Sequence, residues 1–117
     1  DFEANAQNTL PFAQQLRKLA PTEFAAYRNF ADTAVGREDG QIPPRYRELI
    51  AIAAALGTQC VYCLESHTKN AAKLGVTAEE IAEVVYIADA LKAGSVGAHG
   101  MMTMKLYQRA QDQLATD

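Results

Sequence analysis

The chain has 117 residues, of which 49% are hydrophobic and 21% charged, and its formal net charge is −3. This size and composition are typical of one globular domain with a single core, and they exclude a disordered chain. Lysines and arginines are scattered without a basic face, and no apolar run reaches the roughly 20 residues of a membrane span, so we expect no nucleic-acid or membrane partner.

Every periodic segment is typical of helix, and no segment shows the alternation expected of a strand. We therefore predict an all-α, single-domain bundle of six helices. The first starts at Asn8 or Thr9, with Pro11 tolerated in its first turn. The six helices are expected over about residues 8–20, 22–36, 45–56, 60–74, 77–92 and 95–114. The start DFEANAQ lacks the features of a secretory signal, so a cytoplasmic location is expected.

Several residues mark the ends of the later helices. Gly75 should close the fourth helix, since glycine is favoured just after a helix. Thr77 with Glu80 forms a capping-box pattern that should start the fifth. Gly97 and Gly100 are expected to weaken the last helix.

The third predicted helix, RYRELIAIAAAL, is apolar on every side, which indicates a helix buried all round or at a subunit interface. Glu48 is its only charge after Arg47. An ionised carboxylate is costly to remove from water, so a Glu on this helix should be paired or held neutral. The alternative is a solvated first-turn Glu that the helix dipole favours.

The fourth predicted helix begins within GTQCVYCLESH, which holds both cysteines of the chain. Cys60, Cys63 and His67 lie at i, i+3 and i+7 on one face, and Cys63 and His67 are one turn apart. Unpaired N–H groups in a first turn favour a thiolate. A Cys-x-x-Cys beside an imidazole has the groups of a dithiol redox centre, which would oxidise to a Cys60–Cys63 disulfide.

Three other interpretations of the cysteine pair compete. A disulfide across so short a loop restricts the unfolded chain only slightly, so it is a poor stability device. Zinc bound by both cysteines, His67 and Glu48 is disfavoured because structural zinc usually joins two separate ligand pairs, whereas three of these residues share one helix face. We therefore predict no metal or cofactor. A pair of inert, buried cysteines is the remaining alternative.

Glu48, Cys60, Cys63 and His67 fill the pattern E-x11-C-x2-C-x3-H. With the flanking RELIAIAAAL and GVTAEEIAEVVYIADAL, the chain resembles the AhpD-like alkylhydroperoxidase core of the carboxymuconolactone decarboxylase superfamily. The resemblance covers about residues 38–110 of a single domain spanning 1–117. It implies an all-helical fold that assembles as homotrimers or homohexamers.

The resemblance also implies the activity and the roles of the site residues. The chain would be a thiol-dependent peroxidase that acts on hydroperoxides and is reset by a dithiol protein, lipoyl or thioredoxin-like. Cys63 would be the attacking thiol, Cys60 its resolving partner, and Glu48 with His67 the proton relay. Helix-dipole reasoning alone favours Cys60, which is nearer the helix end, so the two arguments disagree. A protein disulfide reductase would use the same dithiol.

Two further residues are candidates for the pocket. Tyr62 stands between the cysteines, where the best-known members carry a His; it could gate access or be an ordinary surface tyrosine. His99, between two glycines, could line the pocket or a subunit interface, or be structural. Two other functions stay open: a lactone decarboxylase-like lyase, although such members generally lack the Cys pair, and a non-catalytic oligomeric stress protein with a vestigial dithiol.

Overall fold

The computed structural model describes the backbone of residues 2–117 and the side chains of residues 11–117. Over this part of the chain it is all helical, with five α-helices and no strand, which confirms the predicted all-α class. The helices are α1 (Phe2–Leu19), α2 (Pro21–Ala34), α3 (Pro44–Thr58), α4 (Val61–Lys73) and α5 (Ala78–Thr116).

The predicted number of six helices is wrong, because the last two form one continuous helix of 39 residues. Gly94, Gly97 and Gly100 all lie inside α5. A glycine in a helix costs about 1 kcal/mol relative to alanine, whereas a proline costs about 3 kcal/mol. Glycine alone therefore weakens this helix without ending it.

The start of α1 also differs from the prediction. The helix begins at Phe2 rather than at Asn8 or Thr9, so Pro11 lies in its interior and not in its first turn. Proline has no N–H, so the helix lacks one backbone hydrogen bond at this point.

The hydrophobic core is formed by α3, α4 and α5. Ile52, Ala71 and Val84 supply one buried side chain from each helix. Partly buried apolar side chains surround them: Leu49, Ala53, Leu56, Leu64, Val76 and Ile81. This core fixes how α4 lies against α3, and the candidate site is built between those two helices.

A tight turn joins α3 to α4. Gln59 ends α3 in the left-handed conformation, with φ 58° and ψ 43°. The backbone N–H of Cys60 then donates to the carbonyl of Ala55 at 2.8 Å. The chain therefore reverses within two residues, which places Cys60 directly at the start of α4.

Two arginines hold the ends of α2 and α5 against α3. Arg47 donates from Nε to the carbonyl of Ile42 at 2.8 Å and from Nη1 to that of Ala34 at 2.7 Å, so it ties down the end of α2 and the following loop. Arg45 pairs through both terminal nitrogens with Glu80 in the first turn of α5.

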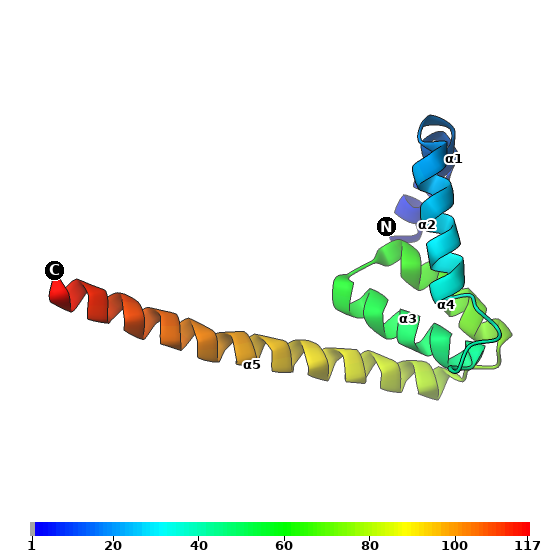
Figure 1. Cartoon of the computed structure of the whole chain (residues 1–117). Helices are drawn as coiled ribbons and strands as arrows, with labels where there is room; N and C mark the ends of the chain where they lie inside the picture. The colour runs from blue at the N-terminus through cyan, green and yellow to red at the C-terminus, as the bar shows by residue number, and fades with distance from the viewer. Residues whose placement is uncertain (1) are drawn as a thin grey trace.

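The chain as a whole is extended. Its radius of gyration is 20.1 Å, against about 13 Å expected for a compact domain of this length. The second half of α5 projects far beyond the other helices (Figure 1), and every residue from 89 to 117 is exposed. Within residues 2–117, no helix has an apolar stretch that could cross a membrane.

Candidate active site

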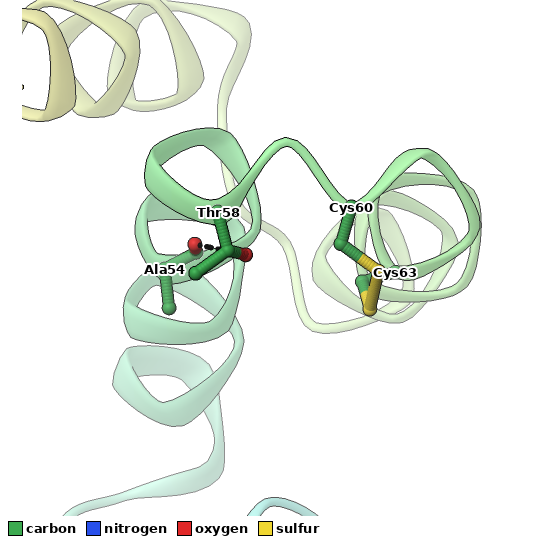
Figure 2. Close-up of a disulfide and its surroundings, with 4 residues drawn as sticks. All are labelled: Ala54, Thr58, Cys60 and Cys63. Carbon is green, nitrogen blue, oxygen red and sulfur yellow. Dashed lines mark hydrogen bonds between the residues drawn. A yellow bond between two sulfur atoms is a disulfide. The ribbon is translucent and has the colours of Figure 1, made fainter.

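The two cysteines form a disulfide at the start of α4 (Figure 2). Cys60 is the extended N-cap residue, with φ −92° and ψ 96°, and Cys63 lies in the first helical turn. Their Cα atoms are 5.4 Å apart, within the range that a disulfide requires. The helix start therefore brings the two sulfurs together, as the Cys-x-x-Cys spacing predicts.

Glu48 is paired and not solvated. Its side chain is buried, with the whole residue only 7% exposed. His67 Nδ1 lies 2.6 Å from Glu48 Oε2, and Asn70 donates from Nδ2 to Glu48 Oε1 at 3.4 Å. Of the two alternatives raised by the sequence, the structure therefore has the paired carboxylate.

These contacts follow from which helix faces meet. On α3, Glu48 shares the buried side with Ile52 and Ala55. On α4, Cys63, His67 and Asn70 are spaced by four and three residues, so they lie on one face. Packing of α4 onto α3 through the shared core brings this polar face against the carboxylate.

A pocket of about 550 Å³ lies over this contact, and α2, α3 and α4 all contribute to its wall. Of the two cysteines, Cys63 is the one that lines it, together with Glu48 and His67. Four alanines are among its lining residues: Ala31, Ala51, Ala54 and Ala55. The pocket therefore joins one sulfur to the buried carboxylate–imidazole pair beneath an apolar wall.

Sequence reasoning missed the contribution of α2 to this pocket. Tyr27, Arg28 and Asp32 line it from that helix, and Arg28 and Asp32 form an ion pair at 3.1 Å. No local spacing relates α2 to the cysteines, so only the packing reveals these residues. Asn70 was also missed, although its position three residues after His67 on the same face could have indicated it.

Tyr62 and His99, the two candidate pocket residues, lie in different parts of the structure. Tyr62 is 54% exposed and lines the pocket beside Cys63. His99 lies on the exposed second half of α5, outside the pocket lining, and its Nδ1 is 2.8 Å from the carbonyl of Ser95. Among the described residues, no group of three or more His, Cys, Asp or Glu side chains could hold a metal ion.

The fold and site define an all-helical protein with a disulfide at the start of a core helix. The sequence profile of the Carboxymuconolactone decarboxylase family matches residues 21–101, a range that includes the four residues of the E-x11-C-x2-C-x3-H pattern. The chain therefore belongs to this family, as the resemblance in the sequence predicts.

Two curated relatives match part of the chain. It is 43% identical over 61 residues to an "Uncharacterized protein 4 in cox locus" of Paracoccus denitrificans. The 61 matched residues are 52% of this chain and 55% of that protein. It is 33% identical over 72 residues to an uncharacterised protein of Cupriavidus necator, 62% of each chain. The chain thus spans between about half and two thirds of the length of these relatives.

Solved structures share the fold. A crystal structure of a carboxymuconolactone decarboxylase family protein from Legionella pneumophila superposes with a TM-score of 0.69 at 28% identity, over 80% of this chain and 81% of that one. A crystal structure from Methanobacterium thermoautotrophicum gives the same TM-score at 25% identity, over 79% of this chain and 98% of that one.

Proposed function

We propose that this protein is a thiol-dependent peroxidase that reduces hydroperoxides with the Cys60–Cys63 pair. The observation that carries the proposal is the 2.6 Å contact between Glu48 Oε2 and His67 Nδ1, in the wall of the pocket that Cys63 also lines. Membership of the Carboxymuconolactone decarboxylase family supports it, because the AhpD-like core that the sequence resembles carries the same four residues.

The proton relay follows from the contact of His67. An ionised carboxylate can only accept hydrogen bonds, so Nδ1 carries the proton toward Glu48 and Nε2 is left with its lone pair. That lone pair can accept the proton of the Cys63 thiol, directly or through one water. The positive charge that develops on the imidazole is stabilised by the buried carboxylate. Together the two groups favour the Cys63 thiolate.

The chemical cycle balances without a bound cofactor. The Cys63 thiolate attacks one oxygen of the hydroperoxide, the O–O bond breaks, and the alkoxide takes up a proton to leave as an alcohol. Cys63 is then a sulfenic acid. The Cys60 thiolate attacks its sulfur and displaces hydroxide, which leaves as water, and the disulfide forms. An external dithiol supplies two electrons and two protons to restore both thiols.

Access favours Cys63 as the attacking thiol. A peroxide must reach the sulfur and the relay at once, and Cys63 lines the pocket with Glu48 and His67. The proposal gives Cys60 at the N-cap the resolving role, and the disulfide between the two sulfurs supports it. The helix dipole favours a thiolate at Cys60, but Cys63 is assigned the attack because general acid–base help requires hydrogen-bond reach.

The test is a coupled peroxidase assay with hydrogen peroxide and an organic hydroperoxide, each with a lipoyl protein or a thioredoxin as donor. The wild-type chain should turn over with at least one donor. Cys60→Ser should stop after one oxidation, with a sulfenic acid that dimedone traps, and Cys63→Ser should not react. Full peroxide turnover by Cys63→Ser would falsify the mechanism.

Two other outcomes would favour a different function. Reduction of a protein disulfide without peroxide turnover would favour a disulfide reductase. Lyase activity that survives loss of both cysteines would favour a decarboxylase-like enzyme.

We also propose that the protein works as a homo-oligomer, a trimer or hexamer. Residues 93–104 contain no Asp, Glu, Lys or Arg, yet all are exposed in the single chain. Apolar side chains in this segment have more than half of their surface exposed: Val96, Met101, Met102 and Met104. A helix that is uncharged all round is normally buried, so a second copy of the chain is the partner that the proposal assigns to it.

A further inference from the structure

We propose that Asn70 is a positioning residue of the proton relay: its amide holds the Glu48 carboxylate in the orientation that presents Oε2 to His67. Asn70 is partly buried on α4 and lines the pocket. Its Nδ2 donates to Glu48 Oε1 at 3.4 Å. The consequence for peroxide chemistry rests on the proposed function, but the positioning itself does not.

The two carboxylate oxygens of Glu48 have different partners. His67 Nδ1 contacts Oε2, and Asn70 Nδ2 donates a hydrogen bond to Oε1. Both oxygens of an ionised carboxylate can only accept, so Asn70 must present its NH₂ group and not its carbonyl. With one donor on each oxygen, rotation of the carboxylate about its last bond is restrained, and the contact with His67 keeps its direction.

Burial makes the second donor important. Glu48 is the one charged side chain that is buried among residues 11–117. A buried polar oxygen without a partner is costly, and a hydrogen bond to the ionised form of a carboxylate favours that form. If Asn70 could not donate, Oε1 would lose the donor that the structure gives it, and the carboxylate would turn or become protonated. Either change would weaken the interaction by which the Glu48 carboxylate stabilises a positive charge on the His67 imidazole.

Other ionisable side chains line the pocket from α2 and from the first turn of α4. Arg28 and Asp32 of α2 pair with each other at 3.1 Å. Tyr27 and Tyr62 also line the pocket. The donor that can be removed without changing a charge is therefore Asn70.

The substitution Asn70→Asp gives a sharp test because it replaces the amide with a carboxyl group of the same shape. Two neighbouring carboxylates share a proton at low pH. In that state the introduced carboxyl group can donate to Glu48 Oε1 as the amide does. As the pH rises toward neutrality the shared proton leaves, the donor is lost and two negative charges face each other. Below about pH 8, where an ordinary thiol is still mostly protonated, the variant should therefore resemble the wild type at the acid end and be impaired near neutrality, whereas Asn70→Leu should be impaired throughout this range.

The measurement is the rate at which iodoacetamide alkylates Cys63 in the reduced chain, read separately from Cys60 by fragment mass spectrometry across pH. This rate follows the thiolate population. The ratio of the Asn70→Asp rate to the wild-type rate should fall about tenfold between low and neutral pH, since coupled carboxylates interact by more than one pK unit. In base the thiol ionises without the relay, so the ratio should return toward one. Asn29→Asp, on the exposed surface of α2, is the matched control and should follow the wild type.

A ratio for Asn70→Asp that does not change with pH, or an Asn70→Leu profile equal to the wild type, would overturn the inference. Circular dichroism and urea unfolding establish that each variant is folded before its profile is read. Because alkylation uses no peroxide, this experiment tests the role of Asn70 independently of the proposed peroxidase function. A wild-type chain without peroxide turnover would refute the proposed function, whereas a pH-independent ratio would refute the role of Asn70 alone.

Discussion

Glu48 Oε2 lies 2.6 Å from His67 Nδ1, and this contact joins α3 to α4 across the candidate site. One end of the pair is a buried carboxylate and the other is an imidazole one helical turn from Cys63. The same interaction therefore contributes to the packing of two core helices and to the proposed thiol chemistry. Changes at this pair should affect stability and reactivity together, whereas changes elsewhere should separate them.

Replacing Glu48 with Gln should slow the oxidation of Cys63 by peroxide about 100-fold, because general base catalysis typically contributes factors of 10² to 10⁴. Gln keeps the shape of the side chain but cannot stabilise a positive imidazole. Stopped-flow oxidation of the reduced chain measures the effect. Glu65→Gln removes a charge from α4 at a residue paired with Lys69 outside the pocket, so it should leave the rate unchanged. Equal losses in both variants would show that net charge, and not the relay, controls the rate.

Glu48→Gln and His67→Asn should be strongly non-additive. If the two residues act as one relay, removing either should cost nearly as much as removing both, since residues that act as a unit have coupled effects. The four rates of a double-mutant cycle on peroxide oxidation give the coupling. Simple multiplication of the two single-variant effects would mean that the residues act independently.

Ile52→Ala should lower the free energy of unfolding by about 2–5 kcal/mol, the usual range for removing a fully buried aliphatic side chain. Ile52 is 1% exposed and packs between α4 and α5. Urea unfolding of the reduced chain gives the value. Ile50→Ala on the same helix is a suitable control, because Ile50 is 54% exposed and should lose far less. If Ile52→Ala lowered the free energy of unfolding as little as Ile50→Ala, Ile52 would not be a core residue.

Stability should fall in acid partly because of Glu80. The pKa of this carboxyl group is lowered from its ordinary value of 4.5, first by the backbone N–H of Thr77 and also by the Thr77 hydroxyl and Arg45. A lowered folded-state pKa adds stability that is fully present above about 4.5 and is lost as the pH falls through the lowered value. The urea midpoint should therefore drop as the pH falls below about 4.5, and less steeply in Glu80→Gln, which can still complete a capping box. An identical pH dependence in both chains would contradict this assignment.

Met104→Glu should weaken self-association. A charge within the uncharged segment 93–104 would have to be buried in the proposed interface, which is costly without a partner. Sedimentation velocity should find the wild type as a homo-oligomer and Met104→Glu shifted toward monomer. Gln113→Glu adds the same charge near the end of α5, where the helix is already polar, and should assemble as the wild type does. A monomeric wild type at every concentration tested would refute the proposed assembly.

Much of the site could be predicted from local spacing. Cys60, Cys63 and His67 share a helix face because of the 3.6-residue period, and Thr77 with Glu80 forms the expected capping box. Asn70 belongs to the same periodicity, because it lies three residues after His67 on the same face, and that position could have indicated it. The spacing could not decide whether Glu48 was solvated or paired, because both alternatives place it in the first turns of α3.

The sequence by itself determined the all-α class, the helix that carries the dithiol and the family to which the chain belongs. These depend on periodicity, capping residues and a four-residue pattern, all of which are local or nearly so. The tertiary structure decided that Glu48 is buried against His67 and Asn70, that α2 lines the pocket and that α5 continues through three glycines. These depend on which faces pack together, and packing between segments distant in sequence leaves no local period from which it can be predicted.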